Sequence, residues 1–185
     1  VRAWPALLSA EGQGVLNMSV GPVVGGVQPL LRLGFGPRRI YLVGGYKGGA
    51  GAVSTVLAYD PVLDSWCEVA SMATERSDHG ATALGGKLFV TGGCGDGGTT
   101  LDQAEEYDPK ADSWQPLPSM PTARCDLVAV AVAGKIYAIG GEQEDGEACN
   151  AIEAYDPVSG AWTRMASLPV TLSHHAATVV GGKIY

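Results

Sequence analysis

The chain has 185 residues, of which 46% are hydrophobic, and its mean hydropathy of +0.11 excludes a disordered polar tail. The formal net charge of −7 and the pI near 4.8 argue against general binding to nucleic acid or to an anionic membrane surface. Glycine is frequent, at 27 residues, and no run of 18 apolar residues occurs, so we expect many short elements and no membrane-spanning helix.

Residues 1–29 show no repeat and no helical periodicity. They lack the basic start and the cleavage site of a signal peptide, and the chain begins with Val1 rather than Met. Three interpretations stay open for this non-repeat segment: a linker, a degenerate copy of the unit that follows, or an artefact of gene prediction.

From residue 30 onward, short markers return at a constant interval of 48 residues. The interval separates the glycine pairs that begin at Gly44, Gly92 and Gly140, the Tyr-Asp-Pro turns at Tyr59, Tyr107 and Tyr155, and Trp66, Trp114 and Trp162. A fourth marker, an apolar residue followed by an aromatic one, occurs four times, from Ile40-Tyr41 to Ile184-Tyr185. Four markers in one register identify an internal repeat.

The second unit predicts four short strands, which we call a to d. The predicted strands are residues 81–84, 88–90, 104–107 and 113–115. A Gly-Gly hairpin turn joins a to b, because glycine tolerates a positive φ, and Asp-Pro turns the chain between c and d. Strand b is apolar throughout, which is typical of a strand covered on both faces.

Four-stranded units covered on both faces predict an all-β propeller. We expect three four-stranded antiparallel blades at residues 30–77, 78–125 and 126–173, and the start of a fourth at 174–185. Residues 30–35 are the candidate for strand a of the first blade. A helical solenoid of similar period is excluded, because the glycine pairs and Asp-Pro would interrupt a helix in every unit.

The double glycine after strand b, the Tyr in c and the Trp in d closely resemble the kelch repeat, over residues 30–185. Met72, Arg76 and Gly80 fit the Met-x-x-x-Arg-x-x-x-Gly form of kelch-like proteins, while the fourth unit has Leu168 and Leu172 instead of Met and Arg. Kelch propellers have about six blades, so the resemblance implies that this chain is a fragment; the alternative is that two copies complete one ring.

In such a blade, the b–c loops and the d–a connections open on the same face, and the resemblance implies that this face binds a partner. The expected partner-binding residues lie before each strand a: Arg76, Ser77, Asp78, Arg124, Cys125, Asp126, Ser173 and His174. The resemblance implies that arginine there pairs with acidic side chains, so an acidic protein or peptide partner is expected. The alternative, of equal weight, is that Arg76 and Arg124 bridge neighbouring blades or pair with Asp78 and Asp126.

No metal or other cofactor is expected. His79 and His175 share one repeat position and are interpreted as packing or hydrogen-bonded residues, which leaves only His174 outside the pattern. Arg124 offers a way to lower the pKa of Cys125 in a redox-sensing cluster with Cys94 and Cys149, but small apolar filling is favoured for the cysteines.

The four cysteines Cys67, Cys94, Cys125 and Cys149 form no C-x-x-C pair. Neither a zinc finger nor a disulfide framework is expected from them, and a reducing, cytoplasmic location fits best.

The expected function is a non-enzymatic protein-interaction module, in one form the recognition part of a ubiquitin-ligase adaptor. Binding to a cullin complex then requires BTB or BACK segments upstream, and none is recognised in this sequence. Two alternatives stay open: a kelch-type enzyme, such as a copper oxidase or a sugar mutarotase, and an actin-associated structural protein. No Gly-x-Ser-x-Gly, Walker or His-Glu-x-x-His motif is present.

Overall fold

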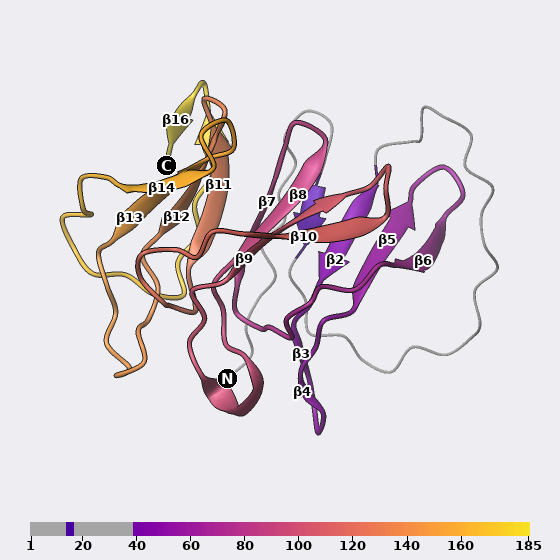
Figure 1. The fold of residues 1–185 in the computed structure, drawn as a ribbon, viewed down its shortest axis with the longest axis horizontal. Coiled ribbons are helices and arrows are strands. Elements are labelled where there is room, and N and C mark those ends of the chain that lie inside the picture. Colours follow the sequence, from indigo (N-terminus) through magenta and orange to yellow (C-terminus); the bar gives the residue numbers. More distant parts are fainter. Residues whose placement is uncertain (1–13, 17–38) are drawn as a thin grey trace.

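The computed structural model describes residues 14–16 and 39–185. These residues form three four-stranded sheets, followed by a short hairpin, and the sheets stand side by side in chain order (Figure 1). This is the partial propeller that the 48-residue interval predicts. Within the described residues, no helix is long and apolar enough to cross a membrane.

The second sheet matches the predicted strands to within two residues at each end. Its strands are β7 (Gly80–Leu84), β8 (Lys87–Thr91), β9 (Ala104–Asp108) and β10 (Ser113–Leu117), all antiparallel and in chain order. The a–b turn is made by Gly85 and Gly86 with φ of 60° and 82°, as a two-residue hairpin requires. A short 3₁₀ turn, η1 (Asp96–Gly98), lies in the b–c loop.

The third sheet repeats this order, and a hairpin starts the fourth unit. The strands of the third sheet are β11 (Val128–Val132), β12 (Lys135–Ile139), β13 (Ile152–Asp156) and β14 (Ala161–Arg164), again antiparallel throughout. The hairpin consists of β15 (Val179–Val180) and β16 (Lys183–Ile184).

The first sheet differs from the expected antiparallel blade in one strand. Antiparallel pairing joins β2 (Ile40–Val43), β5 (Val56–Asp60) and β6 (Ser65–Val69), but β1 (Gly14–Leu16) pairs with β2 in parallel. A two-residue turn forces antiparallel pairing, and no such turn joins β1 to β2, so the parallel arrangement is open to them. The strand expected at residues 30–35 lies outside the described residues, as does the rest of residues 1–29 apart from β1.

The core lies between adjacent sheets. In β8, Leu88 and Val90 pack toward the first sheet, whereas Phe89 between them packs against Ala129 and Ile136 of the third. Alternate side chains therefore serve two different cores, which explains why strand b is apolar at every position.

The glycine pair is needed because neighbouring units approach each other closely there. A Cβ on Gly92 would lie 2.5 Å from the Arg124 carbonyl oxygen, and one on Gly93 would lie 2.5 Å from that of Ser77. Both glycines also have positive φ, at 64° and 103°. Position and conformation thus both exclude a side chain.

The repeated tryptophans connect each blade to the preceding one. The indole N–H of Trp114 donates to the Ala70 carbonyl at 2.7 Å, and Trp162 donates to the Pro118 carbonyl at the same distance. Each indole also packs on the tyrosine of its own blade, with ring centroids 5.2–5.3 Å apart. These contacts give both aromatic residues a structural role in the blades.

Candidate functional site

The two repeat arginines lie inside the fold. Arg76 and Arg124 have no exposed surface. The Arg76 guanidinium donates to the carbonyls of Gly92 and Gln103 and pairs with Glu105 at 2.8 Å. Both terminal nitrogens of this enclosed guanidinium therefore already have partners within the fold.

Arg124 repeats this arrangement one unit later. Its guanidinium donates to the carbonyls of Ala138 and Ala151 and pairs with Glu153 at 3.1 Å. Its backbone belongs to the preceding junction, since its N–H donates to the Leu101 carbonyl at 3.1 Å. The alternative that these arginines bridge neighbouring blades is confirmed, but their carboxylate partners are Glu105 and Glu153 rather than Asp78 and Asp126.

A second, more exposed row is formed by the residues two positions after Arg76, Arg124 and Leu172, which share one repeat position. Asp78, Asp126 and His174 all have left-handed backbone conformations, with φ of 53°, 50° and 54°. The Asp126 N–H donates to the Asp78 carbonyl at 2.8 Å, and the His174 N–H donates to the Asp126 carbonyl at 3.1 Å. Backbone hydrogen bonds therefore align three successive d–a connections side by side.

The start of each b–c loop completes this row. Ser77 pairs with Cys94 through two backbone hydrogen bonds, and Cys125 pairs with Glu142 in the same way. These pairings confirm that b–c loops and d–a connections share one face. The hairpin of β3 (Tyr46–Lys47) and β4 (Gly51–Ala52) and the loop after β8 both extend toward the lower edge of Figure 1.

We call the side chains gathered here the central rim: Asp78, Cys94, Asp126, Glu142 and His174. Of the predicted partner-binding residues, Asp78 and His174 are exposed and Asp126 and Ser173 are half-buried. The other four are buried: Arg76, Ser77, Arg124 and Cys125.

The central rim is acidic. Burial and the negative charge of Asp78 raise the pKa of Asp126, and the positive charge of protonated His174 opposes this rise. His174 Nε2 lies 3.1 Å from an Asp126 carboxylate oxygen. With both arginines enclosed, the rim presents carboxylates where the sequence led us to expect guanidinium groups.

The thiol chemistry also differs from the redox hypothesis. A hydrogen bond with Cys94, together with burial, raises the pKa of Cys125, and the same hydrogen bond lowers the pKa of Cys94. The raised pKa of Cys125 is the opposite of activation by Arg124, whose guanidinium lies 3.8 Å from the Cys149 sulfur instead. All four cysteines are free thiols.

The packing role predicted for His79 and His175 is confirmed. A Cβ on Gly44 would lie 3.0 Å from the His79 ring, and one on Gly140 would lie 2.7 Å from the His175 ring. Burial, reinforced by the charge of Arg76, lowers the pKa of His79 to about 3. His79 is thus neutral in the folded protein near neutral pH.

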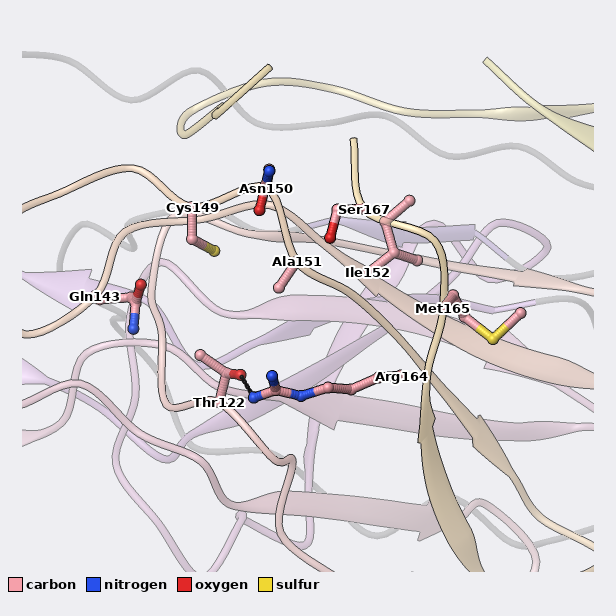
Figure 2. Close-up of a pocket in the computed structure, with 9 residues that line it drawn as sticks. All are labelled: Thr122, Gln143, Cys149, Asn150, Ala151, Ile152, Arg164, Met165 and Ser167. Atoms are coloured by element: carbon pink, nitrogen blue, oxygen red, sulfur yellow. Dashed lines mark hydrogen bonds between the residues drawn. The ribbon is translucent and has the colours of Figure 1, made fainter. Parts of the chain in front are cut away.

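A separate cavity of about 260 Å³ lies beside the third sheet (Figure 2). Arg164 enters it, but its guanidinium already donates to the Thr122 hydroxyl at 3.1 Å and lies 3.6 Å from the Glu153 carboxylate. The Arg164 guanidinium therefore already has partners in the third blade and at its junction with the second.

Two features of the site escaped the sequence analysis. Glu105 and Glu153 share a repeat position, and this coincidence with the two arginines was a usable signal for the buried pairs. The approach of Glu142 to His174 had no comparable signal, because these residues occupy different repeat positions and different units.

Comparison with known proteins agrees with this architecture. The profile of the KLHDC2/KLHL20/DRC7 Kelch-repeats domain matches residues 33–185. The solved structure titled "Structure of YjhT" superposes with a TM-score of 0.64 at 20% sequence identity, over 71% of this chain. The chain spans about half of that structure, 50% of its length. No curated protein matches the sequence. The repeat, the blades and the family match over residues 33–185 show that the chain belongs to the kelch-repeat domain family.

Proposed function

We propose that this chain is a protein-interaction module that recognises its partner through the central rim and the b–c loops beside it. Kelch-repeat domains commonly mediate protein binding, which supports this assignment at the level of the family. The observation that carries it is that the buried and the exposed residues of the d–a connections have different roles. Arg76 and Arg124 hold the blades together, while Asp78 and His174 stay exposed on the loop face.

The chemistry of the rim favours a basic partner. The acidic partner expected from the sequence depended on exposed arginines, and both are enclosed. The carboxylates of Asp126 and Glu142 instead lie close together, and Asp78 is near enough to raise the pKa of Asp126. In the adjoining loop, the Glu144 carboxylate accepts two hydrogen bonds from Thr100 of the second unit. Carboxylates grouped in this way bind lysine and arginine side chains and accelerate encounter with a positively charged segment.

The test is binding of fluorescent peptides of equal length that carry basic, neutral or acidic sequences, followed by anisotropy. We expect the basic peptide to bind preferentially and its affinity to fall as salt is raised. Glu142→Lys should weaken binding about tenfold or more. The matched control is Glu68→Lys, a charge reversal on the exposed outer strand β6, which should leave the affinity within about twofold.

Preference for the acidic peptide, or equal weakening by Glu142→Lys and Glu68→Lys, would overturn the assignment of the rim.

A finer role follows from the family alone. We propose that the chain acts without catalysis, in the cytoplasm, as the recognition part of a larger adaptor such as those of ubiquitin ligases. Co-purification of a cullin with the full-length protein, and its loss on deletion of the upstream region, is the test. A copper oxidase gains no support here, because two of the three histidines, His79 and His175, pack against glycines at separate junctions.

A further inference from the structure

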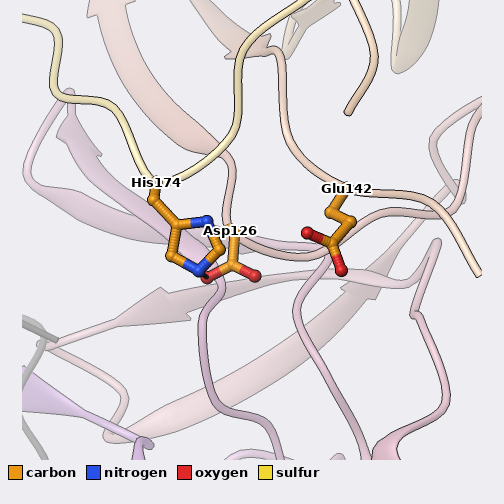
Figure 3. Close-up of side chains that lie close together, drawn as sticks. All are labelled: Asp126, Glu142 and His174. Atoms are coloured by element: carbon orange, nitrogen blue, oxygen red, sulfur yellow. Dashed lines mark ion pairs between the residues drawn. The ribbon is translucent and has the colours of Figure 1, made fainter. Parts of the chain in front are cut away.

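Three metal-ligand side chains meet at one end of the central rim. Asp126 and His174 come from two successive d–a connections, and Glu142 comes from the b–c loop between them in sequence (Figure 3). One ligand atom from each lies within 4.8 Å of the other two. His174 is exposed and the two carboxylates are half-buried, so the group opens to solvent on the loop face.

The imidazole is oriented toward these carboxylates. His174 Nδ1 lies 3.2 Å from the Ser173 hydroxyl, while Nε2 lies 3.1 Å from Asp126 Oδ1. The tautomer that carries its proton on Nδ1 and donates it to Ser173 leaves the Nε2 lone pair available to a metal ion. Histidine ligands of metal ions are oriented in this way by a hydrogen bond at the other ring nitrogen.

Glu142 has an uncommitted carboxylate. Its backbone is held by two hydrogen bonds to Cys125, but in the described part of the chain its carboxylate makes no hydrogen bond and no ion pair. Asp126 supplies a second negative charge at the same place. A divalent cation would balance these two negative charges.

We propose that Asp126, Glu142 and His174 bind a divalent transition-metal ion, for which Zn²⁺ is the expected occupant. Zinc takes nitrogen and oxygen ligands at about 2.0–2.2 Å, so ligand atoms in a tetrahedron lie about 3.4 Å apart. The 3.1 Å between His174 and Asp126 is close to that edge. The Glu142 oxygen lies within 4.8 Å of the other two ligand atoms, so coordination requires it to move inward.

The site has three protein ligands and one open position. The Cys125 thiol lies 3.6 Å from Asp126 Oδ2, the oxygen that does not face His174, so it orients the carboxylate and is not assigned as a ligand. Three protein ligands with an open fourth position are typical of zinc ions that bind an exchangeable water or an incoming group. This inference goes beyond protein binding and does not depend on it.

The test uses the full chain, stripped of metal with a chelator, and titration calorimetry with Zn²⁺ at neutral pH. We expect one equivalent of Zn²⁺ to bind with micromolar or tighter affinity. His174→Ala and Glu142→Gln should each weaken binding about tenfold or more, because each removes a ligand. Asp78→Asn is the matched control, since it removes a neighbouring rim carboxylate outside the ligand group and should change the affinity less than threefold.

Co²⁺ in place of Zn²⁺ gives an independent readout. Visible absorption typical of tetrahedral Co²⁺, without a thiolate charge-transfer band, is expected for two oxygens and one nitrogen. Circular dichroism of the metal-free variants separates loss of a ligand from loss of fold.

The proposal is overturned if the wild-type chain does not bind Zn²⁺ at millimolar concentration. It is also overturned if folded His174→Ala binds as the wild type does. Peptide binding that persists in chelator would leave the proposed protein-interaction function intact in either case.

Discussion

The junction between the second and third blades and the junction that leads to the fourth unit have the same backbone hydrogen bond. They differ in the side chain at that position, which is arginine at the first and leucine at the second. At the first, the Arg124 carbonyl accepts from Gly93 N–H at 3.0 Å, and at the second the Leu172 carbonyl accepts from Gly141 N–H at 2.7 Å. The Arg124 side chain is fully buried, whereas that of Leu172 is 38% exposed. The repeat is therefore maintained by main-chain hydrogen bonds around the glycine pair, and the arginine adds a buried polar link where a carboxylate is available.

Converting one junction into the other gives the largest expected effect. Arg124→Leu gives the earlier junction the leucine that Leu172 supplies at the later one. It also leaves the buried Glu153 without its main cation. Loss of one partner of a buried pair costs about 3–5 kcal/mol, which urea unfolding followed by tryptophan fluorescence will measure. The double variant Arg124→Leu/Glu153→Leu should recover much of this loss, and failure to recover would mean that the charge is not the cause.

The shared backbone contact is tested at the glycine. Gly92→Ala puts a methyl group 2.5 Å from the Arg124 carbonyl in a left-handed conformation, and we expect a loss of about 2–4 kcal/mol. Gly97→Ala is the control, since Gly97 also has a positive φ, 71°, but has no atom within 4 Å of the added carbon. Its cost should be about 1 kcal/mol, and equal costs for the two variants would argue against the close approach.

The junctions also differ in the residue that packs against the first glycine of the pair, and this difference makes stability depend on pH. His79, against Gly44, has its pKa lowered to about 3 in the folded state, from an ordinary value of 6.5, whereas Leu127 occupies the same repeat position at the next junction. Between these two pH values only the unfolded chain binds the proton, so stability falls as pH falls from about 6.5 toward 3. The slope contributed is about 1.4 kcal/mol per pH unit.

His79→Leu removes this titration. In the same series of urea unfolding experiments, the variant should lose less stability than the wild type on acidification. Parallel curves for the two proteins would mean that His79 takes up its proton within the fold.

The smallest expected effect concerns the outer link between blades. Trp162→Phe removes the hydrogen bond to the Pro118 carbonyl but keeps an aromatic ring beside Tyr155. A single hydrogen bond of this kind contributes about 1 kcal/mol, so a small shift of the urea midpoint is expected. A shift as large as that of Gly92→Ala would place the tryptophan, rather than the glycine pair, at the centre of blade packing.

The strands of each blade were predictable because their signals are local. Gly85-Gly86 sets a turn by its own conformation, and the apolar run in β8 reports burial on both faces. The direction of a side chain in a connection is not a local property. Arg76 and Asp78 are two residues apart in one loop, yet the positive φ of Asp78 separates a buried group from an exposed one. The sequence therefore predicted which loops share a face, but it did not predict that both arginines are enclosed.

The alternating environment of β8 has a consequence for how the molecule unfolds. Leu88 and Val90 complete one core and Phe89 completes another, so opening of this blade would expose apolar surface on both of its neighbours. Each blade is thus thermodynamically linked to the next, as in a row of coupled units, and unfolding is expected to start from a boundary of the row. The amide protons of β8 should accordingly be among the slowest to exchange with deuterium.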